Sequence, residues 1–162
     1  MKIKGLEEYL STHPFCEGFD AETIRTLSGC ARNAVFQRGE YIFRRDEPAN
    51  EFFLVRRGQV ALELVHPTRD RITLQTLGEG DVLGWSWLFE PYAWFSDCRT
   101  TELTRVVALN GSCLRTKCEN DRDLGFKVMT RVSKLIIDRL RACRLQILDM
   151  YAAPEGGAWT RR

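Results

Sequence analysis

The sequence contains few of the residues that most often carry catalysis. It has only two histidines among 162 residues, His13 and His66, and each stands beside a proline. No Ser/His/Asp order, His-Glu-x-x-His motif or phosphate-cradling glycine loop occurs. The turn Gly78-Glu79-Gly80 is not followed by a helical pattern, so it is not read as a nucleotide loop. The sequence therefore predicts a protein that is not an enzyme.

Long apolar runs and an excess of one charge are also missing. No stretch approaches the roughly 18 apolar residues of a membrane-spanning helix. Glu7 and Glu8 interrupt the N-terminus before the apolar core of a signal peptide could form. The 24 Lys and Arg residues nearly balance the 22 Asp and Glu residues, and a net charge of +2 does not by itself imply a nucleic-acid partner. We expect a cytoplasmic protein that does not enter a membrane.

The six cysteines include no Cys-x-x-Cys pair. Scattered cysteines without a secretion signal are more often reduced, buried residues than parts of a disulfide framework. Cys113 and Cys118 lie about one turn apart on a predicted short helix and could contribute to a metal site, but two isolated thiols more often belong to a core. We therefore expect no bound metal.

The rest of the sequence indicates one domain, along which the spacing of the apolar residues changes twice. The N-terminal part, 1–33, favours helices, with Asp20 as the N-cap of a helix that runs to about Cys30. The part 34–110 contains short alternating runs at roughly ten-residue spacing, which Gly, Pro, Asn or Asp separate. Such spacing predicts an antiparallel sandwich or barrel.

Helical spacing returns in 111–151. Ser112 can cap a short helix, and Asp121 can cap a long one from about Arg122 to Tyr151. At 1.5 Å per residue the long helix is on the order of 40 Å in length, more than a small β domain can cover. Its apolar stripe therefore predicts a partner helix, most simply from a second copy, whereas the alternative is a helix folded back on its own domain. The stripe contains Val132, Ile136, Leu140, Cys143, Ile147 and Met150. Residues 152–162 are predicted to form a flexible tail.

Three motifs in the β region resemble those of the cyclic nucleotide-binding domain. They are Arg38-Gly39-Glu40-Tyr41-Ile42-Phe43, Phe53-Leu54-Val55-Arg56-Arg57-Gly58-Gln59-Val60 and Leu77-Gly78-Glu79-Gly80-Asp81-Val82-Leu83-Gly84. The order of small helices, β region and long helix is also similar, so that the resemblance covers about residues 6–151. It implies a mainly β fold, with an antiparallel, jelly-roll-like β roll of about eight strands between N-terminal helices and a long C-terminal helix, and a ligand-sensing role.

The sequence differs from the family motif in the segment that binds the cyclic nucleotide. In cyclic-nucleotide binders a Glu follows the glycine equivalent to Gly84 and holds the ribose, and an Arg about ten residues later pairs with the phosphate. Here Trp85 replaces the Glu, and Trp94 or Phe95 stands at the Arg position. A buried anion needs a fixed cation, so we do not expect cyclic AMP or cyclic GMP to bind in the usual way. The resemblance places the degenerate cassette at Gly84, Trp85, Ser86, Trp87, Trp94, Phe95, Ser96 and Asp97, with Arg99 as the nearest arginine.

The aromatic cassette allows three interpretations. Its rings could plug the cavity or form core. They could also make a flat pocket for another planar ligand, with a nucleotide as one candidate. In the third interpretation they form an exposed patch on which a partner protein docks.

The length after the long helix bears on the function. Transcription factors of the catabolite-activator type, in the same superfamily, carry a helix-turn-helix domain of roughly 70 residues there, whereas 11 residues follow Tyr151. The sequence therefore predicts no DNA binding by that mode. The long helix is basic between Lys127 and Arg144, which indicates a solvated face or a match for an acidic patch on a partner.

A second motif resembles a smaller group of stand-alone relatives. Trp85-Ser86-Trp87-Leu88-Phe89, together with Thr104–Leu109 and Leu124-Gly125, is similar to the accessory subunit of soluble NAD-reducing hydrogenases. The predicted function is a non-catalytic regulatory or accessory module that senses a non-standard ligand or docks onto a redox enzyme complex such as a hydrogenase. The alternative is a homodimeric cyclic-nucleotide sensor that uses Arg99 or another arginine.

Overall fold

The computed structural model describes residues 5–68 and 70–152 of the chain. Helices α1 (Leu6–Thr12), η1 (Pro14–Cys16) and α2 (Ala21–Gly29) come first. The last elements are α3 (Gly111–Asn120) and the long helix α4 (Arg122–Ala152). Between them lie eight strands: β1 (Ala31–Phe36), β2 (Tyr41–Phe43), β3 (Glu51–Arg57), β4 (Val60–Val65), β5 (Arg71–Leu77), β6 (Val82–Leu83), β7 (Asp97–Thr100) and β8 (Thr104–Asn110).

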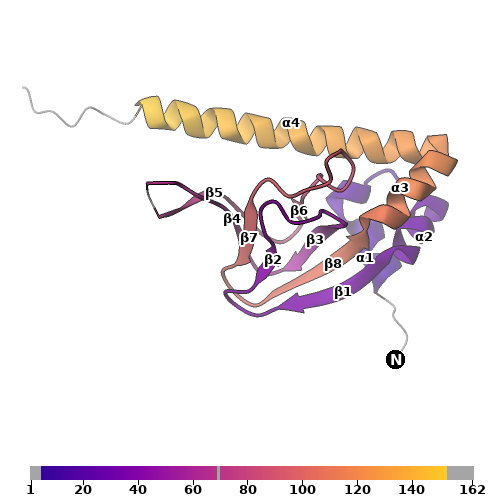
Figure 1. The fold of residues 1–162 in the computed structure, drawn as a ribbon. Helices are drawn as coiled ribbons and strands as arrows, with labels where there is room; N and C mark the ends of the chain where they lie inside the picture. The colour runs from indigo at the N-terminus through magenta and orange to yellow at the C-terminus, as the bar shows by residue number, and fades with distance from the viewer. Residues whose placement is uncertain (1–4, 69, 153–162) are drawn as a thin grey trace, which may run out of the picture.

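The strands form two antiparallel sheets that enclose the interior of the roll (Figure 1). The first sheet has the order β1-β8-β3-β6 and the second has the order β2-β7-β4-β5. Because side chains alternate along a strand, the first sheet has two buried faces. Its inner face supplies Phe53, Val55, Val106 and Ala108 to the roll core, which the second sheet completes. Its other face supplies Phe52, Leu54, Val107 and Leu109 to a second core under the helices.

Capping side chains set the starts of the helices. Asp20 accepts a hydrogen bond from the Thr23 backbone N–H at 2.7 Å, and Asp121 accepts one from the Leu124 N–H at 3.1 Å, as the sequence predicted. The predicted cap at Ser112 is wrong, because Asn110 accepts from the Cys113 N–H at 2.8 Å instead. The first strand also begins at Ala31, three residues before the predicted boundary.

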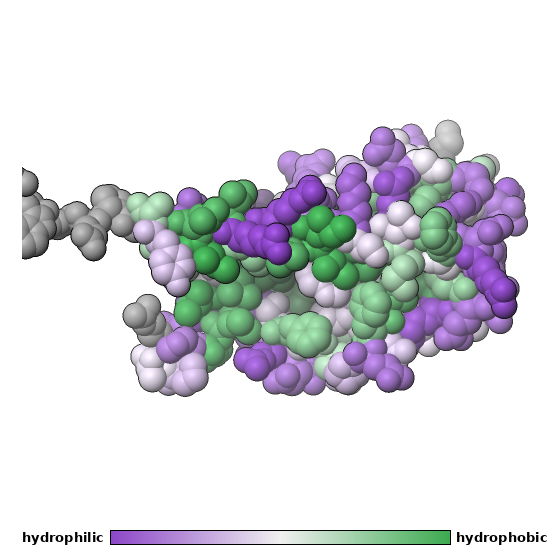
Figure 2. Space-filling model, turned by 90° about the horizontal axis from the view of Figure 1, so that it is seen from above, coloured by the Kyte–Doolittle hydropathy of each residue, from purple (hydrophilic) through white to green (hydrophobic). Residues whose placement is uncertain are grey.

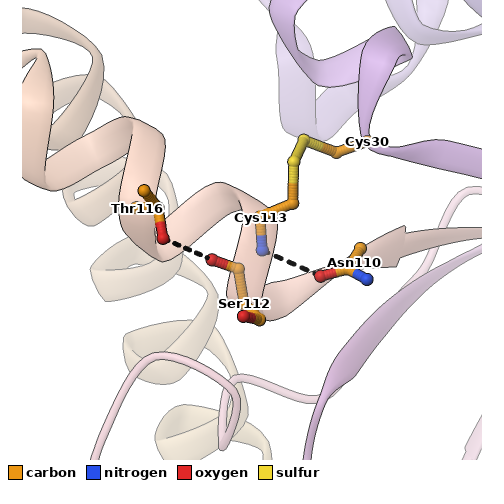
Figure 3. The surroundings of a disulfide bond; sticks show 5 residues. All are labelled: Cys30, Asn110, Ser112, Cys113 and Thr116. Carbon is orange, nitrogen blue, oxygen red and sulfur yellow. Dashed lines mark hydrogen bonds between the residues drawn. A yellow bond between two sulfur atoms is a disulfide. The ribbon is translucent and has the colours of Figure 1, made fainter.

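Two cysteines form a disulfide, which corrects the expectation of scattered reduced thiols. Cys30 at the end of α2 is bonded to Cys113 in the first turn of α3, with 6.2 Å between the Cα atoms (Figure 3). The bond joins segments that are 83 residues apart in the sequence, so spacing alone could not reveal it. Cys16 and Cys98 are buried free thiols, Cys118 is half-buried, and Cys143 is exposed.

Helix α4 runs along the top of the roll and ends above the β4–β5 hairpin (Figure 1). Leu124, Val128 and Val132 on its first half pack into the core under the helices, and Ile136 packs against that core. The domain's own core therefore covers Val132, whereas Ile136, the next residue of the predicted interface, is only partly buried. No helix within 5–68 and 70–152 is long and apolar enough to span a membrane.

Beyond Arg139 the apolar side chains of α4 are exposed. We call them, with the exposed apolar residues of the hairpin beneath, the distal surface: Leu140, Cys143, Leu145, Ile147, Leu148, Met150 and Tyr151 of α4, and Val65, Ile72 and Leu74 of β4 and β5. Figure 2 shows apolar side chains gathered at this end of the helix and on the strands beside it. The side-chain amide of Gln146 donates to the Leu74 carbonyl at 2.8 Å and ties the two parts together. The predicted tail lies outside the described residues, apart from Ala152.

Candidate functional site

The loop between β6 and β7 carries the predicted cassette, and backbone pairing holds its C-terminal end. The Trp94 N–H donates to the Glu47 carbonyl at 3.1 Å, and the Asp46 N–H donates to the Trp94 carbonyl at 2.9 Å. The Ala49 N–H donates to the Tyr92 carbonyl. These bonds join the cassette to the loop between β2 and β3, and they place the Trp94 side chain over the roll interior.

Trp94 fills the space beside Gly84. Its indole stacks on Phe43 with ring centroids 3.8 Å apart and planes at 10°, and only 5% of the residue is exposed. Gly84 has φ of +85°, and a Cβ placed on it would collide with the Trp94 ring. A glycine is therefore required at position 84 both by its backbone conformation and by the indole against it. Of the two positions at which the resemblance puts the family's arginine, Trp94 thus holds a buried aromatic ring and Phe95 an exposed one.

Trp87 and Trp85 lie on the other side of the first sheet. Trp87 is fully buried under the helices and stacks on Phe52 with ring centroids 4.9 Å apart. The Arg115 guanidinium donates to the Trp87 carbonyl, and the indole N–H of Trp87 has no hydrogen-bond partner among the described residues. Trp85 is half-buried against the same core. The structure brings Trp94 to Gly84 but places Trp85 and Trp87 in a different core.

The remaining cassette residues have separate roles. Ser86 is buried, Ser96 is half-buried, and Phe95 is 67% exposed. The Asp97 side chain is buried and accepts a hydrogen bond from the Arg45 backbone N–H at 2.8 Å. It therefore helps to hold the start of the loop between β2 and β3.

Arg99 points away from the roll interior. Its neighbour on β7, Cys98, lies in the roll core, so alternation turns Arg99 to the outer face of the second sheet. There its guanidinium pairs with the Glu63 carboxylate at 2.6 Å, and Arg71 pairs with the same carboxylate at 2.9 Å. The hydrogen bond from Arg99 is the main cause that lowers the pKa of Glu63, against the opposing effect of burial. Arg99 thus donates its hydrogen bonds to Glu63 on the outside of the roll, in a cluster of two guanidinium groups and one carboxylate.

Sequence reasoning missed Arg139, which is the last buried residue along α4. Its guanidinium donates to the Val82 carbonyl at 2.6 Å and to the Gln75 side-chain oxygen at 3.1 Å. No carboxylate within 5–68 or 70–152 lies within 4.0 Å of it, and desolvation lowers its pKa. Burial raises the pKa of the Cys98 thiol in the roll core, and the charge of Arg139 opposes that rise. Position 139 is seven residues after Val132, so helical spacing puts it on the buried face, and that spacing was the available signal.

Metal-binding chemistry has no assembled site in the described part of the chain. No group of three or more His, Cys, Asp or Glu side chains there could hold an ion.

His13 is buried. Its Nδ1 accepts a hydrogen bond from the Phe15 N–H at 3.1 Å, while its Nε2 has no partner among the described residues. Desolvation lowers the pKa of His13 to about 4, so the ring is neutral at pH 7.

Comparison with known proteins identifies the family to which this fold belongs. Residues 34–121 match the family described as cyclic nucleotide-binding domain, over more than half of the chain. The chain belongs to the cyclic nucleotide-binding domain family. The predicted fold, an antiparallel roll of eight strands with N-terminal helices and a long C-terminal helix, is confirmed.

Three similar proteins illustrate the range of the match. A CRP-like cAMP-activated global transcriptional regulator of Mycobacterium tuberculosis is 21% identical over 145 residues, which are 90% of this chain and 63% of the regulator. A structure described as a cyclic nucleotide-binding protein of Geobacter metallireducens GS-15 is 28% identical, with a TM-score of 0.76 over 83% of this chain and 97% of that one. A cyclic nucleotide-binding domain from Methylobacillus flagellatus KT is 20% identical, with a TM-score of 0.77 over 94% of this chain and 84% of that one. The chain thus spans less than two thirds of the curated regulator that it matches.

Proposed function

We propose that this family member is a non-catalytic regulatory or accessory module that acts through protein contacts and does not hold cyclic AMP or cyclic GMP in the usual way. The observation that carries the proposal is the buried Trp94 ring, stacked on Phe43 against Gly84. A bound nucleotide would have to displace this ring and give up the burial of a large aromatic side chain. The free energy gained from contacts between the nucleotide and the protein would have to exceed this cost for the nucleotide to bind.

The charges around the cassette support the same conclusion. A buried phosphate needs a cation with free donors, but Arg99 lies on the outer face and shares Glu63 with Arg71. Asp97, next to Cys98 on β7, supplies a carboxylate and no cation, and it accepts a hydrogen bond from the Arg45 backbone N–H. The cassette residues therefore favour aromatic packing over anion binding.

Calorimetry tests the ligand part of the proposal. We expect no heat of binding with cyclic AMP or cyclic GMP, and no rise in melting temperature with either. NADH and NADPH serve as planar nucleotides of another class. Saturable binding of a cyclic nucleotide to the wild type that is lost in the charged variant W94E, but not when exposed Phe95 is changed to Ala, would overturn the proposal.

The distal surface is the proposed contact region. Leu140 and Ile147 are 49% and 53% exposed and, with Cys143, were predicted from the sequence as interface residues. Apolar side chains gathered on one side of a protein typically mark an interaction site. The simplest partner for this surface is a second copy of the chain, packed helix against helix. A more specific candidate is a subunit of a redox complex such as a hydrogenase. The motif Trp85–Phe89 supports the latter through its resemblance to the accessory subunit.

Light scattering after size-exclusion chromatography tests the second-copy arrangement. The wild type is expected to run as a dimer, and the double variant L140D/I147D is expected to run as a monomer that keeps its melting temperature. R141E on the same helix is the matched control and should remain dimeric. A monomeric wild type would instead direct the search to a heterologous partner, with purified candidate redox subunits mixed against both variants.

The second candidate is a cyclic-nucleotide sensor, which is favoured by family membership and by Arg139. Arg139 reaches from α4 to the Val82 carbonyl of β6, and its charge opposes the rise that burial causes in the pKa of Cys98 in the roll core. If the roll opened, this guanidinium could pair with a phosphate and couple the ligand to α4. Loss of cyclic-nucleotide binding in R139Q, with binding retained in R141Q, would support this candidate.

A further inference from the structure

An arginine-rich groove lies on the first sheet, outside the roll and apart from the distal surface. It has a volume of about 490 Å³ and is lined by Arg56 and Arg57 of β3, Arg105 and Val106 of β8, and Asn33, Ala34 and Val35 of β1. Helices cover the rest of this outer face of the sheet, and they end beside the groove. Tyr9 of α1 donates its hydroxyl to the Val55 carbonyl at 3.1 Å, at the edge of the groove.

A bulge in β3 explains why two consecutive arginines line one groove. Val55 pairs with Val106, and Arg57 pairs with Arg105, so β3 has one residue more than β8 at this point. In a regular strand Arg56 and Arg57 would point to opposite faces, and Arg57 would enter the roll. The extra residue re-aims the strand, so that both side chains remain on the outer side. The result is three guanidinium groups on two neighbouring strands.

These three arginines are not neutralised by carboxylates. Arg57 and Arg105 are direct cross-strand partners, and like charges in that position are destabilising. Within 5–68 and 70–152, no carboxylate oxygen lies within 4.0 Å of any of the three. The Arg56 side chain donates to the Asn33 side-chain oxygen at 3.3 Å and lies over the Tyr9 ring. By contrast, Arg32 at the other end of the same sheet is paired with Glu51 at 2.8 Å.

We propose that this groove binds the phosphoryl groups of a phosphorylated small molecule. Guanidinium groups match phosphate oxygens through paired N–H donors, and their charge does not depend on pH in the physiological range. Three unpaired positive charges call for an anion with more than one negative charge, which a single carboxylate does not supply. The volume exceeds that of a phosphate ion and falls within the range of small-molecule sites, so the exposed Val35 and the Asn33 amide can face the organic part.

This site is independent of the proposed function. It uses neither the roll interior nor the distal surface, and it would operate in a monomer or a dimer. It would let the module respond to a phosphorylated metabolite although Trp94 fills the usual site.

Inorganic pyrophosphate is the first probe, and citrate is a carboxylate probe of similar charge. Calorimetry and the arginine Nε–Hε signals in NMR spectra would follow binding to the full chain. Pyrophosphate is expected to shift the signals of Arg57 and Arg105 saturably and to bind at least ten times more tightly than citrate. The double variant R57A/R105A is expected to bind at least ten times more weakly, and R57K/R105K to fall between, because lysine keeps the charge but loses the paired donors.

The matched control is R141A, which removes one exposed arginine from α4. It should bind pyrophosphate like the wild type. Because R57A/R105A removes two facing like charges, we expect its melting temperature to equal or exceed that of the wild type, so weaker binding would not result from unfolding. Equal affinity for citrate and pyrophosphate, or binding unchanged in R57A/R105A, would overturn the proposal.

Discussion

The Trp94 indole lies flat on the Phe43 ring, 3.8 Å from centroid to centroid, and closes the space in front of Gly84. Gly84 keeps the backbone conformation that the family motif implies, with φ of +85°. Beside it lie stacked aromatic rings, where the resemblance implies a cationic partner for a phosphate. The chain has the fold of the family, and aromatic side chains fill the interior of the roll next to Gly84.

Truncating Trp94 tests whether this stack stabilises the roll. W94A removes a side chain that is 5% exposed, and we expect a loss of about 3–5 kcal/mol in the free energy of unfolding in urea. Added indole should recover part of that loss by entering the cavity. F95A, at a residue 67% exposed, should change stability by no more than about 0.5 kcal/mol. Equal losses in the two variants would contradict a core role for Trp94.

The Cys30–Cys113 bond should stabilise the whole domain. It closes a long loop between segments 83 residues apart, so the variant C30S/C113S is expected to unfold about 2–5 kcal/mol more easily. Adding a reductant to the wild type should produce the same loss in a urea titration. C143S, which changes an exposed free thiol, is the control and should be unaffected. A wild-type protein insensitive to reductant would refute the disulfide.

His13 predicts a pH dependence of stability. Its pKa is lowered to about 4 in the folded protein by desolvation, against an ordinary value of 6.5. The folded state therefore favours the neutral ring, so this stabilisation is complete above about pH 6.5 and is lost as the pH falls toward 4. The shift corresponds to a loss on the order of 3 kcal/mol. H13N should remove this slope, and a titration of the His13 ring by NMR near pH 6.5 would contradict the prediction.

Glu63 predicts a second pH effect at lower pH. Its side chain is 2% exposed and receives hydrogen bonds from Arg99 and Arg71, and its folded pKa is lowered. Its contribution is therefore present above about pH 4.5 and is lost as the pH falls through the folded pKa. We expect E63Q to lose about 1–3 kcal/mol at pH 7, with the difference from the wild type shrinking in acid. E51Q, at the more exposed Arg32 pair, should lose less than about 1 kcal/mol, and equal losses in both variants would count against a buried role for Glu63.

Local features of the fold were predictable from the sequence, and long-range ones were not. Asp20 and Asp121 cap helices through bonds to residues only three positions away, so their roles follow from the nearby sequence. The apolar runs of β4 and β8 likewise show in the sequence. Strand β6 has only two residues, too few to produce a periodic pattern.

The candidate site was harder to predict because its parts belong to different layers. Trp87 and Trp94 are seven residues apart in the sequence but lie on opposite sides of the first sheet, which only the path of the loop determines. The β3 bulge at Arg56 depends on pairing with β8, and the disulfide depends on where α2 and α3 meet. Arg139 lies on the buried face of α4, seven residues after Val132, but the predicted stripe used its apolar neighbour Leu140, which is exposed.

Helix α4 consists of two parts with different local stability. Its 31 residues extend about 46 Å, and Arg139 marks the end of the part that the domain's own cores hold in place. Amide hydrogens before Arg139 should exchange only when the domain opens globally, whereas those after it can exchange by unwinding a few turns. Any partner that covers the last turns would slow that exchange, so the protection of this segment measures how far it is occupied.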